Sequence, residues 1–261
     1  MRKSLGLLAL VAVVVVAFVV SGSAGAERRT AVAGTSFKYC DNPTFPPMEN
    51  STTGGKPTGF DIDFANALAA HMGGKATFVF SSFSGLLPAL GAKRCDVVIS
   101  GIFITPDRTK QFPAVAYMHS HRALIVAGGN PKHIKKPADL KGKSVAVQAA
   151  TKYAAYLQGL KKKLGFTLRT YPGDTDAIGQ ILIGRADAVL SQDTSAAYAM
   201  SQHPGKVAIG YLFPDTDAFG VYYRRGDSIG GKISAAIKAL KANGTLRKLA
   251  VKYHIPPGDV K

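Results

Sequence analysis

The hydrophobic residues of this 261-residue chain follow two alternating spacings. Short apolar runs, typical of buried strands, alternate with longer segments in which apolar residues recur every three or four positions, as on one face of a helix. The predicted strands are residues 36–40, 76–80, 95–100, 144–148, 166–171 and 186–190. The predicted helices are residues 60–72, 86–90, 174–183 and 229–240, with a further helix that opens at 149–151 and a last helix that begins at 244–246. Strands that alternate with helices indicate an α/β fold with parallel sheet.

The helix predicted over residues 60–72 has the clearest amphipathic spacing. Its apolar positions fall at four-residue steps, at Phe60, Phe64, Leu68 and Met72. Asp61 and Asp63 lie in its first turn, where a carboxylate interacts favourably with the positive end of the helix dipole. We therefore assign these two aspartates a structural role at the helix start.

The first 26 residues have the pattern of a signal peptide. Arg2 and Lys3 precede an apolar run over residues 5–20, and Ala24-Gly25-Ala26 supplies a cleavage site of small residues. A membrane anchor is the alternative, but the apolar run is short for one. No cysteine follows the run, which argues against a lipoprotein. We expect cleavage near Ala26 and a soluble, exported protein.

The chain is strongly basic. Without Arg2 and Lys3, its 33 basic residues become 31 against 16 acidic ones, a formal charge of about +15. Such a balance suggests nucleic-acid binding, but export and the lack of a nucleic-acid motif argue against it. Between residues 131 and 169, Asp139 is the only acid among ten lysines and arginines. This segment is either a solvated basic face or a surface for an anionic membrane or an acidic patch of a transporter.

The two cysteines are not expected to form a disulfide. Cys40 lies at the end of the first predicted strand and Cys95 at the start of a parallel neighbour, which places them at opposite ends of the sheet. A disulfide needs Cα atoms within about 7 Å of each other. We therefore predict two free thiols, although the periplasm allows disulfides to form.

A candidate binding residue follows the strand at 95–100. The apolar strand runs into Ser100-Gly101, and open α/β sheets place their ligands at the carboxyl ends of such strands. Thr105 or Asp107 can cap a short helix that begins at Pro106. Arg108 would then lie in its first turn and present a planar fork to a carboxylate. The alternative is a surface arginine after an ordinary turn.

Three motifs together resemble those of the periplasmic solute-binding proteins of polar amino-acid ABC transporters, extracellular solute-binding protein family 3. They are residues 98–108, Gly59-Phe60-Asp61-Ile62-Asp63 and Gly184-Arg185-Ala186-Asp187-Ala188, and the resemblance covers about residues 35–255. It implies a type II two-lobed fold, in which each lobe is a sheet flanked by helices. Residues 27–124 with 217–261 would form lobe 1 and residues 125–216 lobe 2. Segments 122–127 and 219–223 would be the two hinge crossings.

The resemblance also implies a ligand site in the cleft between the lobes. Arg108 would bind a carboxylate, with help from the turn at Thr151, and Asp193 would bind the α-ammonium. Phe45 and Phe83 would hold the ligand side chain between them. The full predicted set is Asn42, Phe45, Glu49, Phe83, Ser100, Gly101, Phe103, Arg108, Thr151 and Asp193.

Several of these assignments have alternatives, and two positions depart from the family pattern. Phe45 can instead fill the core, and Thr151 and Asp193 can be helix N-caps. Phe103 stands where the family usually has a threonine that binds the carboxylate. Ala150 stands where the family has glycine, and its N–H can serve the ligand only if its φ is ordinary.

The predicted function is capture of an amino acid for an inner-membrane ABC permease, by a monomer without metal, cofactor or catalytic residues. Glu49 could meet a cationic side chain or point at solvent, which favours a basic or polar amino acid as ligand. His119 and His121 lack a third ligand nearby in sequence and are not assigned to a metal. The alternatives are an exported dehydratase of the cyclohexadienyl or arogenate type on the same scaffold, or a sensory binding module.

Overall fold

The structure, a computed structural model, describes residues 35–51 and 54–260. The predicted signal peptide, residues 1–26, lies outside the described residues. Within the described part, no helix is long and apolar enough to span a membrane.

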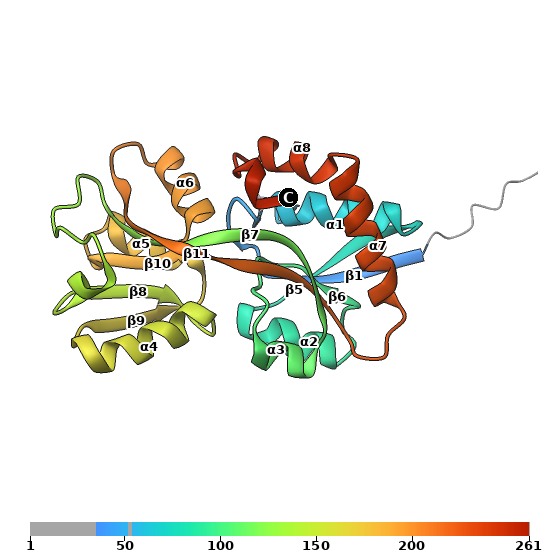
Figure 1. The fold of residues 1–261 in the computed structure, drawn as a ribbon, viewed down its shortest axis with the longest axis horizontal. Helices are drawn as coiled ribbons and strands as arrows, with labels where there is room; N and C mark the ends of the chain where they lie inside the picture. The colour runs from blue at the N-terminus through green and yellow to red at the C-terminus, as the bar shows by residue number, and fades with distance from the viewer. Residues whose placement is uncertain (1–34, 52–53, 261) are drawn as a thin grey trace, which may run out of the picture. The chain divides into compact units, whose positions relative to one another are not determined.

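One eight-stranded sheet carries the fold (Figure 1). Its order is β5–β1–β6–β11–β7–β10–β8–β9. The strands are β1 (Thr35–Asp41), β5 (Gly74–Phe80), β6 (Val97–Val98), β7 (Ala114–Ala127), β8 (Ser144–Gln148), β9 (Thr167–Tyr171), β10 (Ala188–Gln192) and β11 (Val207–Tyr223). β1 runs parallel to β5 and β6, and β8 runs parallel to β9 and β10. These two parallel sections confirm the predicted α/β class.

The two sections are joined by long antiparallel strands that the sequence reading did not foresee. β7 and β11 pair with each other over most of their length, and β11 also pairs with β6 while β7 pairs with β10. The predicted crossings at 122–127 and 219–223 are only the ends of these strands. The pairing is irregular between Leu212 and Thr216, a stretch that includes Pro214, which has no N–H to donate. The lobe boundaries at 124/125 and 216/217 fall within these strands and stay predictions.

Helices cover both sections (Figure 1). They are α1 (Phe60–His71), α2 (Leu86–Gly91), α3 (Pro106–Gln111), α4 (Lys152–Leu164), α5 (Asp174–Leu182), α6 (Asp193–Gln202), α7 (Ile229–Ala242) and α8 (Thr245–Lys252). α1, α7 and α8 pack on one another beside β1 and β5, and α4 and α5 pack on β8 and β9. A small sheet of β2 (Thr44–Phe45), β3 (Glu49–Ser51) and β4 (Pro57–Thr58) was not predicted, because its turn-forming residues indicated a loop.

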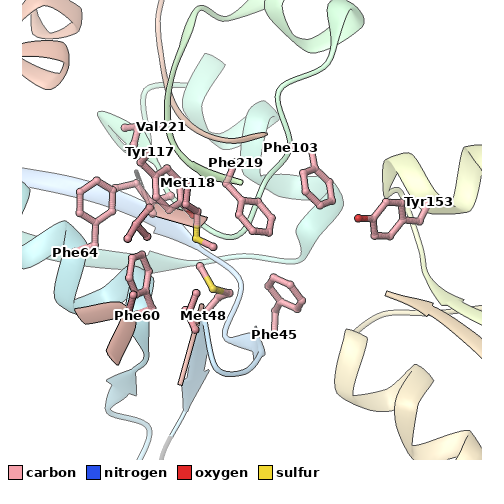
Figure 2. Packing of buried hydrophobic residues seen from close by; sticks show 14 of the residues in the cluster. Phe45, Met48, Phe60, Phe64, Phe103, Tyr117, Met118, Tyr153, Phe219 and Val221 are labelled. Carbon is pink, nitrogen blue, oxygen red and sulfur yellow. The ribbon is translucent and has the colours of Figure 1, made fainter. Parts of the chain in front are cut away.

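A series of aromatic rings extends from α1 towards the predicted site (Figure 2). Phe64 stacks on Tyr117 at 4.9 Å between ring centroids, Tyr117 lies 6.1 Å from Phe219, and Phe219 stacks on Phe103 at 4.6 Å. Such ring pairs contribute about 0.5–1.5 kcal/mol each beyond the burial of their area. The position of Phe103 is therefore set by the core behind it.

The prediction of two free thiols was wrong. Cys40 and Cys95 form a disulfide, with 5.6 Å between their Cα atoms. The predicted strand 95–100 is only Val97–Val98, and the chain bends at Asp96 just before it. Cys95 therefore lies before the strand, on a bent segment. The prediction had placed it as the first residue of a straight strand parallel to β1. Val98 pairs with Cys40 itself, so the short strand lies beside the carboxyl end of β1.

Candidate functional site

Arg108 lies at a junction between the two parallel sections. The hydroxyl of Thr105 accepts a hydrogen bond from Arg108 N at 3.4 Å, which confirms Thr105 as the N-cap of α3. The guanidinium donates to Phe103 O at 2.9 Å and to Ala150 O at 3.5 Å, and it lies 5.6 Å from the centroid of the Phe83 ring. Partial burial lowers the pKa of Arg108 from its usual value, but an arginine remains cationic under these conditions. Its partners are thus main-chain oxygens, the Tyr222 hydroxyl and an aromatic face.

Aromatic and amide side chains surround a small cavity beside Arg108. The lining residues are Phe45, Phe83, Gly101, Phe103, Gln148, Thr151 and Gln192. The cavity has a volume of about 10 Å³, which is about the space that one water molecule needs. None of these seven lining side chains is charged. The arrangement therefore suits a neutral group and is narrower than any amino acid.

The aromatic residues belong to the core and to the cavity wall at the same time. Phe45 is buried and meets Phe219 edge to face at 6.3 Å between centroids. Phe103 faces Tyr153, the second residue of α4, at 5.2 Å (Figure 2). Gly101 has a φ of 49°, and a Cβ there would lie 2.4 Å from the Phe45 ring. Glycine at 101 is therefore what allows Phe45 to close over the loop after β6.

A pair of amide side chains joins the loop after β1 to the end of β8. Gln148 Nε2 donates to Asn42 Oδ1 at 3.2 Å and to Pro172 O at 3.2 Å. Asn42 Oδ1 also accepts from the Thr44 hydroxyl at 2.7 Å, and Asn42 Nδ2 donates to Ser81 O at 2.9 Å. Asn42 was a predicted ligand contact, and in this arrangement its side-chain oxygen is occupied by Thr44 and Gln148.

The turn before α4 departs from ordinary backbone geometry. Thr151 is the N-cap of α4, since its hydroxyl accepts from Ala154 N at 3.0 Å, and it also donates to Gln148 O at 2.8 Å. Ala150 has a φ of 60°, in the left-handed region. The condition of an ordinary φ at Ala150 is therefore not met. A non-glycine residue in this region carries strain of about 1–3 kcal/mol.

Asp193 occupies the first position of α6 rather than its N-cap, which is Gln192. Its Oδ1 accepts from the Ser120 hydroxyl at 2.6 Å and from Thr194 N at 2.8 Å. The side chain is half-buried, and Asp193 is not among the residues that line the small cavity. The residue before it, Gln192, lines the cavity instead.

Three carboxyl groups are buried behind the cavity, which corrects three sequence-based assignments. Glu49 neither lines the cavity nor points at solvent, because it is fully buried and its Oε1 accepts from the Ser100 hydroxyl at 2.9 Å. Ser100 does not line the cavity, and its hydroxyl also accepts from Asn42 N at 2.9 Å. Asp61 has more than a helix-start role: it accepts from Gly101 N at 2.7 Å and from the Tyr117 hydroxyl at 2.8 Å. Asp41 is the third buried carboxyl group.

Burial raises the pKa of all three carboxyl groups. Loss of hydration and the nearby Asp61 raise the pKa of Asp41 to about 8. Burial, with Asp61 and Asp41 close by, raises the pKa of Glu49 well above its usual range. Burial raises the pKa of Asp61 to about 6, while the bonds from Gly101 and Tyr117 act in the opposite direction. Burial therefore favours the protonated form of Asp41 and Glu49, while the hydrogen bonds that Asp61 accepts favour its ionised form.

Sequence reasoning missed Gln148 and Gln192. Each is the last residue of a buried strand, β8 and β10 respectively. Polar residues at the carboxyl ends of parallel strands lie at the edge where α/β sheets bind ligands. That rule, applied to these two strands as it was to the strand before Arg108, would have found both.

The sheet topology and the residues gathered at strand ends are those of the two-lobed periplasmic-binding-protein fold. The chain belongs to the bacterial extracellular solute-binding proteins, family 3, whose family model matches residues 37–256. It is 32% identical over 213 residues to the L-cystine-binding protein of Escherichia coli K12, covering 80% of this chain and 79% of that protein.

Solved structures agree with this assignment. An ancestral arginine-binding protein bound to arginine superposes with a TM-score of 0.79 at 32% identity, covering 84% of this chain and 97% of that one. An ancestral amino acid-binding protein described as a precursor of cyclohexadienyl dehydratase gives a TM-score of 0.76 at 30% identity, covering 84% and 94%. The chain is thus a solute-binding protein by family and by fold.

Proposed function

We propose that this protein captures an amino acid between its two lobes and delivers it, as an exported monomer, to an inner-membrane ABC permease. The observation that carries this proposal is the state of Arg108. Within residues 35–51 and 54–260, its guanidinium pairs with no carboxylate and instead contacts the main-chain oxygens of Phe103 and Ala150 and the Tyr222 hydroxyl. A ligand carboxylate can replace such bonds with a charge-assisted, bidentate pair.

The ligand site would be completed from the other section of the sheet. Asp193 would bind the α-ammonium, because its carboxylate lies at the carboxyl end of β10, beside Ser120. Phe45 and Phe83 would contact the ligand side chain. The relatives point the same way, since those reported above are named for binding cystine or arginine or as amino acid-binding.

We further propose that the ligand side chain is uncharged. Glu49 was the reason to favour a basic amino acid, and it is buried behind Ser100. The cavity is lined instead by aromatic rings, a threonine and two glutamines. A cationic side chain placed there would lose its hydration without meeting a carboxylate. A neutral polar side chain can exchange hydrogen bonds with Gln148 and Gln192.

Ligand entry would require the cavity to widen, because its present volume is about that of one water molecule. The bonds that close it join the two sections: Gln148 to Asn42, and Arg108 to Ala150. Separation of the lobes at β7 and β11 would break both. Hinge closure of this kind allows a ligand to stabilise the closed state by its extra contacts there.

A thermal-shift screen of the chain from Glu27 onward tests this function. The panel should hold neutral, cationic and acidic amino acids, cystine, and carboxylic acids that lack the ammonium. A ligand at 100 times its Kd adds about 2.7 kcal/mol of stability, which is a clear shift of the melting midpoint. A hit among neutral polar amino acids supports the proposal, and a cationic hit overturns the ligand class. Silence for every amino acid, with turnover of a prephenate-like substrate, would favour the dehydratase alternative.

A further inference from the structure

A cluster of lysines lies on one part of the molecule, away from the ligand site. Its seven members, here the lysine cluster, are Lys135, Lys136, Lys141, Lys143, Lys161, Lys162 and Lys163. Six of them are exposed and Lys143 is half-buried. None lines the cavity beside Arg108. Whatever the cluster does is therefore separate from ligand recognition.

Main-chain hydrogen bonds bring together three groups of these lysines. The groups are Lys135 and Lys136, Lys141 and Lys143, and the three lysines at 161–163. Asp139 N donates to Lys136 O at 3.0 Å and Lys143 N to Leu140 O at 2.9 Å, so residues 135–143 form one compact segment. Gly142 N then donates to Gly165 O at 3.2 Å, which fixes this segment against the end of α4. The last turn of α4 carries Lys161, Lys162 and Lys163. The main chain thus brings the segments that carry these lysines close together, although the lysines are up to 28 positions apart in sequence.

The charges of the cluster are not neutralised by ion pairs within the described part of the chain. Asp139 is the only acid between residues 131 and 169, and it bonds to the main-chain nitrogen of Lys135. The neighbouring Lys132 has an acidic partner, Asp187, at 3.8 Å. Lysines at the end of α4 also stabilise the helix dipole. That effect accounts for Lys161, Lys162 and Lys163 and leaves the other four unexplained.

The composition of this surface distinguishes between classes of partner. Protein interfaces are enriched in aromatic residues, methionine and arginine, and are depleted in lysine. The exposed large apolar side chains of the described residues are Phe80, Leu182, Ile183, Met200, Ile209, Leu212 and Val251, and none lies between 131 and 169. A surface whose lysine-bearing segments contribute no exposed large apolar side chain suits lipid headgroups, which attract basic residues by charge and need no shaped contact.

We propose that the lysine cluster docks this protein on an anionic lipid surface. Docking would keep the protein near the membrane that holds its permease while the ligand site stays free. The attraction is electrostatic and would act over about 8–10 Å at physiological salt, so added salt should weaken it.

The test uses the chain from Glu27 onward, because the described residues, 35–51 and 54–260, belong to one compact unit. Sedimentation with vesicles of equal parts phosphatidylglycerol and phosphatidylcholine is compared with pure phosphatidylcholine. The cluster variant, Lys136→Gln, Lys141→Gln, Lys162→Gln, neutralises one lysine in each of the three groups. A matched control removes the same charge from exposed lysines of α7 and α8, in the variant Lys232→Gln, Lys238→Gln, Lys248→Gln.

The expected result is binding to the anionic vesicles only, reduced about tenfold or more in the cluster variant, since each basic residue near the surface strengthens binding several-fold. The control should stay within about twofold of the unchanged protein, with melting midpoints and ligand affinity preserved in both. An equal loss in both variants would mean attraction by net charge alone and overturn the proposal. So would binding to soluble polyglutamate but not to vesicles, which would indicate an acidic protein surface as the partner.

Discussion

Gln148 Nε2 donates to Asn42 Oδ1 at 3.2 Å, although the two residues are 106 positions apart. Asn42 follows β1 and Gln148 ends β8, so this bond joins the two parallel sections of the sheet beside the cavity. Arg108 makes a second connection through Ala150 O. A ligand that binds here must exchange its own contacts for these.

Arg108→Ala should weaken amino-acid binding at least about tenfold, because a hydrogen bond between charged groups contributes about 1.5–3 kcal/mol. Arg108→Lys keeps the charge without the planar fork and should give an intermediate loss. Arg225→Ala is the matched control, since the exposed Arg225 donates to Thr109 O and Lys110 O of the same helix. Titration calorimetry measures all three, and unchanged affinity in Arg108→Ala would remove Arg108 from the site.

Asp193→Asn should weaken binding of amino acids but spare a carboxylic acid of the same skeleton that lacks the ammonium. The asparagine keeps an oxygen for Ser120 and loses only the charge. Ser120→Ala is the converse control, because it removes the bond and keeps the charge. Equal losses for both ligands in Asp193→Asn would contradict the assigned role.

Ala150→Gly should stabilise the protein by about 1 kcal/mol, because glycine adopts the φ of 60° without the steric conflict of a Cβ. Ala149→Gly is the comparison, since Ala149 lacks a positive φ and glycine there should cost about 0.5–1 kcal/mol in chain entropy. Urea unfolding measures both. A loss of stability in Ala150→Gly would mean that the strain at this turn is offset by contacts of the methyl group.

Stability should fall as the pH rises from about 4 to about 8. The folded-state pKa of Asp41 is raised from 3.8 to about 8 and that of Asp61 to about 6. Between the unfolded pKa of each group and its raised folded pKa, the native state binds more protons than the unfolded state. The stability is therefore greatest below the unfolded pKa and is lost as the pH rises through the folded one. The slope is at most about 1.4 kcal/mol per pH unit for each proton released.

Asp41→Asn should flatten this dependence between pH 6 and 9, since asparagine resembles the protonated carboxyl group and does not titrate. Asp107→Asn, at an exposed residue paired with Lys110, is the control. Free energies of unfolding at pH 5.5, 7 and 8.5 measure the slopes. The same slope in Asp41→Asn as in the unchanged protein would contradict the assignment of a protonated Asp41.

Replacing both cysteines by alanine should destabilise the protein by about 2–4 kcal/mol, because the disulfide closes a loop of 55 residues that is otherwise free in the unfolded state. Thermal midpoints with and without a reductant measure the effect. The reductant should lower the midpoint of the unchanged protein and leave that of the double variant as it was. If the reductant leaves the midpoint of the unchanged protein where it was, the disulfide removes little conformational entropy from the unfolded state.

The sequence alone determined the elements whose causes are local. The four-residue steps of α1, the apolar run of β8, and a cap at Thr105 or Asp107 for a helix that begins at Pro106 depend on residues within one or two turns of each other. For the same reason, the motifs around Gly59, Gly101 and Gly184 were enough to indicate the family. The basic segment at 131–169 was also visible, because charge is a property of composition.

The tertiary structure decided what depends on strand register and on burial. Whether Cys40 and Cys95 meet depends on where a two-residue strand begins and on the bend before it. Whether Glu49 faces a ligand depends on the position of Ser100, 51 residues later in the chain. The lengths of β7 and β11 depend on their pairing with each other. These outcomes arise from contacts between distant segments. The sequence names an aspartate or glutamate without showing whether its carboxyl group is buried and protonated or exposed and charged.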